Sequence, residues 1–126
     1  MRAADTNVLV RLIARDDVRQ VAAAERFVAP GAWISQLVLA ETTCVLESVF
    51  NLGWREIATA VEMLLDHDCL TIQDSDIVRA AVAQSRRKPT VSFSDCLILE
   101  IARKAGHLPL GTFDRQLGSL ADAERL

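Results

Sequence analysis

The chain has 126 residues, a hydrophobic share of 51% and a formal net charge of −3 at pH 7. This length suits a single domain over residues 1–126, and the hydrophobic share excludes an intrinsically disordered chain. The slightly acidic balance excludes a basic surface over the whole molecule, although a local basic patch is compatible with it.

Short apolar segments alternate with amphipathic ones along the whole chain. In order, we expect a strand at 2–5, helices at 7–15 and 17–28, a strand at 32–34, helices at 36–50 and 54–67, a strand at 70–72, helices at 75–87 and 95–105, a strand at 108–112 and a short helix from Asp114. Strands separated by helices are typical of βαβ units, which build a parallel sheet covered on both faces. The sequence therefore predicts an α/β fold, with ligands at the carboxyl ends of its strands.

Capping residues support the predicted boundaries. Ser35 precedes the helix at 36–50, Asp74 the helix at 75–87, and either Ser92 or Ser94 the helix at 95–105. Gly106 follows the last of these helices, as expected of a C-terminal stop.

Two acids fall at carboxyl ends of predicted strands. Asp5 closes the first strand, and Asp114 follows the last strand in "LPLGTFD". Both therefore lie on the side of the sheet where ligands bind.

Two further acids are predicted to face inward on helices. Glu41 is spaced to lie on the apolar stripe of its helix, which runs through Leu37, Val38, Cys44, Val45 and Val49. Asp95, in the first turn of its helix, is predicted to share the buried face of Ile98, Ala102 and Ala105. A buried carboxylate is costly unless it is compensated, and no Lys or Arg at matching spacing faces these two acids.

A divalent cation is the partner that these four acids favour. Magnesium and manganese take hard oxygen ligands, bind one or two carboxylates directly and keep several waters. The absence of His and Cys from the set argues against zinc. We expect Mg²⁺ or Mn²⁺ to stabilise the fold and, without metal, at least one carboxylate to have a raised pKa.

The same residues lie in segments that resemble a known family. The runs "DTNVLVRLI", "ISQLVLAETTCVL", "VSFSDCLILEIARKAG" and "LPLGTFDRQL" resemble the PIN domain, specifically the VapC-type toxins of bacterial toxin–antitoxin pairs. The likeness spans essentially the whole chain in the family's order. Ser94 and Cys96 flank Asp95 where small alanines are more usual, a departure that concerns the fine geometry of the site.

The resemblance implies a three-layer α/β/α domain with a central parallel sheet and a metal-dependent ribonuclease site. The family's acids carry over onto Asp5, Glu41, Asp95 and Asp114, and its supporting polar positions onto Thr6, Asn7 and Thr112. We expect Asp5 and Asp95 to bind the metal directly. Glu41 and Asp114 are left open as direct ligands, ligands through water or ligands of a second metal. The resemblance also implies a homodimer and a cognate antitoxin that holds the enzyme inactive.

An RNA substrate requires positive charge near the acids. The candidates for RNA contact are Arg11, Arg15, Arg86, Arg87, Lys88 and Arg115. The alternative for the run 86–88 is a solvated helix end, where cations are favoured. Because aromatic residues make up only 5% of the chain, we expect no stacking platform for single strands and favour recognition of a folded RNA by shape.

One apolar turn has two interpretations. Phe50, Leu52 and Trp54 surround a predicted helix–helix turn and either cover the core or form part of an interface.

Three other functions fit this sequence less well than a nuclease. A phospho-receiver domain requires an acidic pair after the first strand and a Lys after the last, and no Lys follows Lys104. A haloacid-dehalogenase-like phosphatase requires DxD, and Asn7 replaces its second acid. A catalytically silent binding module is disfavoured by the presence of all four acids.

The cellular compartment is predicted from cysteines and hydropathy. Cys44, Cys69 and Cys96 form no CxxC pair, which indicates reduced thiols. Asp5, Asn7 and Arg11 interrupt the apolar run that a signal peptide would need, and no apolar stretch reaches the length of a membrane helix. We therefore expect a cytoplasmic protein.

Overall fold

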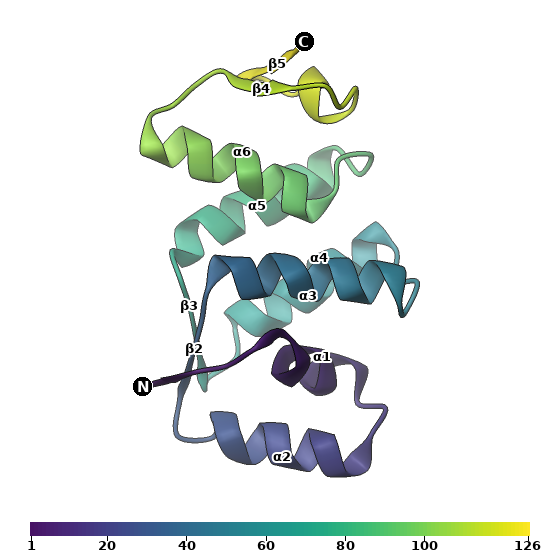
Figure 1. The fold of residues 1–126 in the computed structure, drawn as a ribbon, viewed down its shortest axis with the longest axis vertical. Helices are drawn as coiled ribbons and strands as arrows, with labels where there is room; N and C mark the ends of the chain where they lie inside the picture. The colour runs from purple at the N-terminus through teal and green to yellow at the C-terminus, as the bar shows by residue number, and fades with distance from the viewer.

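Helices dominate the computed structural model, which describes residues 1–126 (Figure 1). The elements are β1 (Arg2–Ala3), α1 (Thr6–Ala14), α2 (Val18–Val28), β2 (Ala32–Ile34), α3 (Gln36–Ser48), α4 (Trp54–Leu65), β3 (Leu70–Ile72), α5 (Ser75–Arg87), α6 (Phe93–Ala105), β4 (Leu110–Thr112), a 3₁₀ helix (Leu117–Ser119) and β5 (Ala123–Arg125). The predicted α/β order is confirmed, and the strands 32–34 and 70–72 have their predicted bounds.

The strands are all parallel, but they form two separate ladders. One sheet has the order β1-β2-β3, with Ala3 opposite Trp33 and Trp33 opposite Thr71. The other consists of β4 and β5, with Gly111 opposite Glu124. Figure 1 shows β4 and β5 at one end of the molecule, with the pair α1 and α2 at the other end. The prediction of a parallel sheet is confirmed, whereas its division into two ladders was not foreseen.

Several strand and turn boundaries differ from the prediction. The first strand ends at Ala3, and Asp5 is instead the N-cap of α1. The fourth strand starts at Leu110, and the short helix after Asp114 is a single 3₁₀ turn. Strand β5 was missed because "AER" carries no apolar alternation of its own.

The predicted buried face of α3 is wrong. The side chains that are buried are Leu39, Thr42, Thr43 and Leu46, whereas Leu37 is 72% exposed and Val49 is 65% exposed. The buried set has helical spacing once the threonines are counted as core residues. They can be buried because Thr42 Oγ1 donates to the Val38 carbonyl and Thr43 Oγ1 to the Ala40 carbonyl, at 2.8 and 2.9 Å. Glu41 is therefore exposed, beside the buried face instead of on it.

The predicted face of α6 is also wrong. Its buried side chains are Phe93, Cys96, Leu97 and Leu99, while Ile98 is 49% exposed and Ala105 is exposed. The helix packs mainly against α5, so the face toward α5 is the one removed from water. Asp95 lies at the border of this face and is half-buried.

The caps agree with the prediction in two of three helices. Ser35 Oγ accepts the Val38 N–H at 3.1 Å, and Ser92 Oγ accepts the Asp95 N–H at 3.2 Å. Asp74 occupies the N-cap position of α5, but its side chain makes no capping hydrogen bond. Gly106 ends α6 with φ of 83°, a left-handed conformation that suits glycine.

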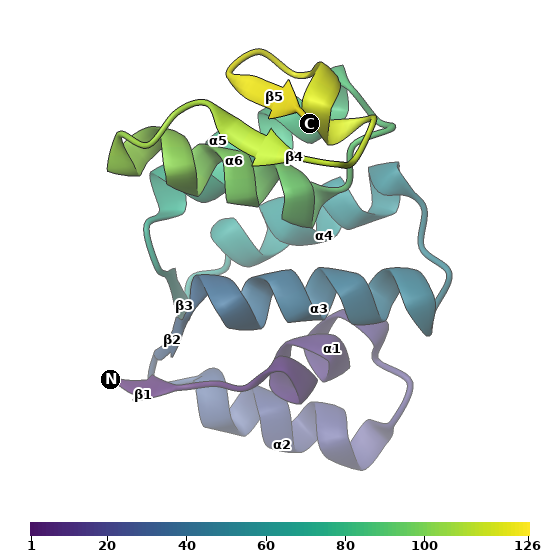
Figure 2. The ribbon, with the colours of Figure 1, turned by 45° about the horizontal axis from the view of Figure 1, so that its top comes forward.

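One hydrophobic cluster joins the helices. The largest fully buried side chains include Leu9, Ile34, Leu39, Leu46, Ile57 and Leu99. Figure 2 shows α3 and α4 between the pair α1 and α2 on one side and the pair α5 and α6 on the other. No helix in this structure is both long and apolar enough to cross a membrane.

Candidate active site

The first two candidate acids meet at Thr6. Asp5 follows β1 and caps α1, and its Oδ1 accepts the Thr6 N–H at 2.7 Å. The Thr6 hydroxyl donates to Glu41 Oε2 on α3, also at 2.7 Å. Thr6 is only 8% exposed, whereas both carboxylates reach solvent. A single buried threonine thus fixes two solvent-facing acids from different helices.

The other two acids belong to α6 and to the turn after β4. Asp95 stands in the first turn of α6, where Ser92 caps the helix. Asp114 follows β4: its N–H donates to Thr112 Oγ1 at 3.0 Å, and its Oδ1 accepts the Leu117 N–H at 2.8 Å. Burial raises the pKa of Asp95, the charge of Asp114 raises it further, and hydrogen bonding by Ser92 opposes the rise. Asp95 and Asp114 are therefore close enough to repel each other.

The structure places the four acids as two pairs, not as one cluster. No group of three or more His, Cys, Asp and Glu side chains is arranged to hold a metal ion. The reason lies in the sheet: β4 pairs with β5 and not with β1, so the carboxyl ends of β1 and β4 do not meet at one edge. The expectation of a single four-carboxylate pocket assumed that they would.

The chemistry of the donors nevertheless suits magnesium or manganese. None of the four acids takes part in an ion pair, although Asp16, Glu25 and Glu62 all do. Two unneutralised carboxylates, with water completing the shell, are the protein ligands that Mg²⁺ commonly takes. Each pair fits that requirement in donor type.

The three supporting polar residues differ in whether they contact a candidate acid. Thr6 and Thr112 each hydrogen-bond a candidate acid. Asn7 is exposed and instead lines a cavity of about 430 Å³ between α1 and α2.

The sequence matches the family model of the PIN domain over residues 3–123. The chain belongs to the PIN domain family. Its helices and parallel strands are consistent with the three-layer α/β/α fold of this family. Because the residues matched by the family model include all four acids, both carboxylate pairs lie within the PIN domain.

The chain is also similar to a solved structure. The crystal structure of VapC20 from Mycobacterium tuberculosis, described as a sarcin–ricin loop cleaving toxin, is 22% identical to this PIN domain. The match covers 95% of each chain, with a TM-score of 0.40. No curated protein matches the chain.

The Arg and Lys side chains predicted to contact RNA differ in whether a carboxylate neutralises them. Arg11 pairs with Asp16 at 2.5 Å, Arg15 pairs with Glu25 at 2.9 Å, and Arg86 pairs with Glu62. Arg87 and Lys88 bond to the uncharged partners Gln84 and Ser119, and Arg115 is exposed without a partner. The PIN domain therefore keeps unneutralised positive charge at Arg87, Lys88 and Arg115.

One carboxylate near the site was missed by sequence reasoning. Glu47, at the end of α3, lies close enough to Asp95 to feel its charge. Burial is the main cause of its raised pKa, and Asp95 adds to it. Its exposed helical position and ordinary spacing carried no signal in the sequence.

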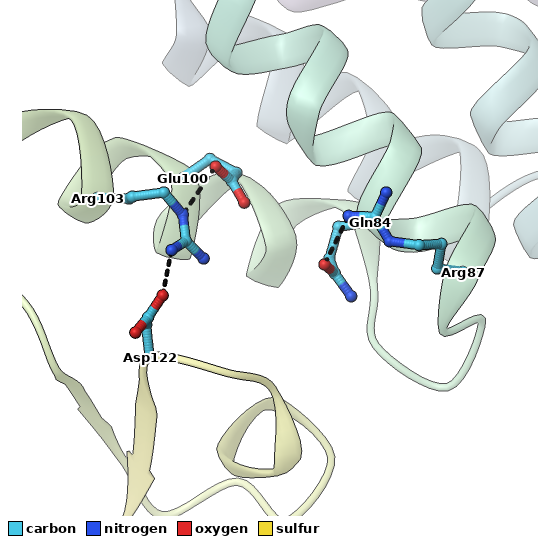
Figure 3. A network of polar contacts seen from close by, with 5 residues as sticks. All are labelled: Gln84, Arg87, Glu100, Arg103 and Asp122. Atoms are coloured by element: carbon cyan, nitrogen blue, oxygen red, sulfur yellow. Dashed lines mark hydrogen bonds and ion pairs between the residues drawn. The ribbon is translucent and has the colours of Figure 1, made fainter.

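A network of ion pairs joins α6 to the ladder of β4 and β5, whose strand β4 leads to Asp114. Figure 3 shows Arg103 of α6 between Glu100 on the same helix and Asp122 just before β5. The Glu100 contact is 3.2 Å long. Arg103 thereby ties the ladder of β4 and β5 to the helix that bears Asp95.

Proposed function

We propose that this PIN domain is an endoribonuclease toxin that hydrolyses phosphodiester bonds in RNA with the help of Mg²⁺ or Mn²⁺. The observation that carries the proposal is the set of four carboxylates, none neutralised by Lys or Arg, within a PIN domain. Acids left unpaired at the surface of a small domain are what a cation-dependent hydrolase requires.

Two acids are assigned as direct ligands. Asp5 and Asp95 would each bind a cation directly within their own pair, with Glu41 and Asp114 as further ligands, directly, through water or at a second metal position. A bound Mg²⁺ or Mn²⁺ makes water more acidic and offsets negative charge on a phosphate.

The protein's own side chains have three tasks. Thr6 keeps the Glu41 carboxylate in place, and Thr112 does the same for the backbone of Asp114. Arg87, Lys88 and Arg115 attract the phosphates of the RNA, since no carboxylate neutralises them.

The proposal extends to partners and location. A cognate antitoxin would neutralise the enzyme, and a homodimer would be its working form, as the resemblance to VapC-type toxins implies. Three free cysteines suit a reducing cytoplasm.

The decisive experiment is cleavage of a pool of cellular RNA by the purified protein in manganese, magnesium or EDTA. We expect discrete fragments with metal, none in EDTA, and a loss of at least about 100-fold in Asp5→Asn. Asp68→Asn is the matched control, because Asp68 is an exposed acid outside both pairs.

The alternatives give different results. Cleavage that survives both EDTA and Asp5→Asn would come from a contaminating nuclease and would remove the support for this function. A folded protein that binds metal but cuts no RNA in the pool would favour a binding module instead.

A further inference from the structure

A second cavity lies beside Asp95 and is not used by the proposed chemistry. It has a volume of about 400 Å³ and lies between the end of α3, the start of α4 and the loop from α5 to α6. This volume falls within the roughly 300–1,000 Å³ of small-molecule sites. Its lining includes one carboxylate, one indole and three hydroxyl groups, from Glu47, Trp54, Ser85, Thr90 and Ser92.

The cavity shares a wall with the candidate active site. Ser92 lines it, and the same Ser92 hydroxyl accepts the N–H of Asp95 at 3.2 Å. Phe93, which also lines the cavity, is two residues before Asp95. A ligand in this cavity would therefore lie next to Ser92, whose hydroxyl bonds the backbone of the assigned metal ligand Asp95.

Trp54 gives the cavity an aromatic wall. The side chain is 39% exposed at the start of α4, and the Arg55 guanidinium lies 5.0 Å from the centroid of its ring. Such a cation–aromatic contact holds the indole in position. An accessible indole is a surface on which a nucleobase stacks. The sequence pattern allowed Trp54 either to cover the core or to form part of an interface. Its exposed ring suits a third role, as a stacking platform for one base.

Glu47 determines which base would fit. An ionised carboxylate offers two acceptor oxygens and no donor. Guanine is the RNA base with two adjacent N–H donors on its Watson–Crick edge, N1–H and the N2 amino group, which a carboxylate accepts in parallel. Adenine, cytosine and uracil each place an acceptor beside their donor, which a carboxylate repels.

We propose that this cavity binds a guanine base of the RNA, in a nucleotide adjacent to the cleaved bond, with Trp54 stacking on the base and Glu47 accepting its two N–H groups. This inference rests on the proposed ribonuclease function. Arg87 and Lys88, at the end of α5 and before the loop that lines the cavity, are placed for the phosphates of the same strand.

The first test uses nucleotides as probes and the two tryptophans as reporters. In ¹H–¹⁵N spectra the indole signals of Trp33 and Trp54 are assigned with Trp54→Phe, and GMP, IMP or AMP is added in EDTA. We expect GMP to shift the Trp54 signal and leave Trp33 unchanged, since Trp33 lies on β2. IMP lacks the N2 amino group and should bind at least about tenfold more weakly, and AMP should bind more weakly still.

Variants then test the carboxylate. Glu47→Gln should abolish the preference for GMP over IMP, because the amide places a donor against a guanine donor. Glu124→Gln is the matched control, as Glu124 is an exposed acid on β5. Equal affinity for the three nucleotides, or a preference for GMP that survives Glu47→Gln, would overturn the inference.

Mapping the cleavage sites separates this inference from the function on which it rests. Metal-dependent cuts next to guanine, moved to other bases by Glu47→Gln, support both. Metal-dependent cuts with no neighbouring guanine would support the nuclease function and overturn the guanine site. Glu47-dependent binding of GMP without any RNA cleavage would support guanine binding in the cavity and overturn the proposed nuclease function.

Discussion

Thr6 carries two hydrogen bonds that position acids from two helices at once. Its N–H bonds Asp5 and its hydroxyl bonds Glu41, both at 2.7 Å. The backbone bond forms whatever the side chain is, but the hydroxyl bond depends on threonine or serine. The side chain of Thr6 is therefore a positioning group for Glu41 alone.

Replacing Thr6 with valine keeps the shape of the side chain and removes the hydroxyl. We expect Thr6→Val to cost about 1 kcal/mol of stability and to lower the metal-dependent cleavage rate, because Glu41 is no longer held. Urea unfolding measures the first effect and the RNA assay the second. Thr6→Ser should restore the rate, and Thr71→Val, at an exposed threonine of β3, should change neither quantity. A rate unchanged in Thr6→Val would show that Glu41 does not need this bond.

The ionised carboxylate of Asp95 is needed to bind metal, but it lowers the stability of the metal-free fold. Its pKa is raised by burial and by Asp114, so the folded state disfavours the ionised carboxylate. The sign follows from linkage: the raised pKa favours the fold at low pH, and this contribution is lost as the pH rises through the raised value. At neutral pH without metal, ionised Asp95 is therefore a cost to the fold.

Asp95→Asn removes that cost and also removes a metal ligand. In EDTA at pH 7 we expect the melting temperature of the variant to rise by about 1–3 °C, a small change because solvent screens a half-buried carboxylate. In Mg²⁺ the wild type should gain stability and the variant should gain less. Thermal melts in both buffers, with Asp68→Asn as the control, measure the effect. A lower melting temperature for the variant in EDTA would contradict the assigned sign.

At the scale of elements, helix positions were predictable and helix faces were not. The bounds of α3 and α6 were close to those expected, since caps such as Ser35 and Ser92 are local signals. The buried face of α3 depends on Thr42 and Thr43, whose hydroxyls are satisfied by their own helix and so behave as core side chains. A polarity pattern treats threonine as an outward residue and therefore misplaces Glu41.

The same limit applies to the candidate site. The positions of Asp5 and Asp114 after strands could be predicted because they depend on local sequence, whereas the role of the four acids as metal ligands stays a prediction. Their grouping into pairs could not be predicted, because it depends on which strand β4 pairs with. Glu47 and Trp54 were missed as site residues for a related reason: a cavity between three elements has no signal in any one of them.

At the scale of the whole molecule, the two carboxylate pairs are carried by different elements. Asp5 and Glu41 belong to α1 and α3, and Asp95 and Asp114 belong to α6 and the turn after β4. The ladder of β4 and β5 is joined to the helices through α6, with Arg103 as a charged link to Asp122. The position of Asp114 therefore depends on contacts of this region with α6 and, through the bond of Lys88 to Ser119, with the end of α5.

Arg103→Met tests this dependence, since methionine keeps an apolar stem and removes both ion pairs. Exposed ion pairs contribute about 0.2–1 kcal/mol each, so the global melting temperature should fall by less than about 3 °C. The local effect should be larger: amide exchange in β4 and β5 should accelerate about 3- to 10-fold, because these short strands lose their link to α6. Hydrogen exchange by mass spectrometry measures it, and Arg79→Met, which breaks the pair of α5 with Asp66 at the end of α4, is the control. If both variants leave exchange in β4 and β5 unchanged, the ladder is held by apolar contacts such as those of Leu117 and Leu120, and Arg103 does not position Asp114.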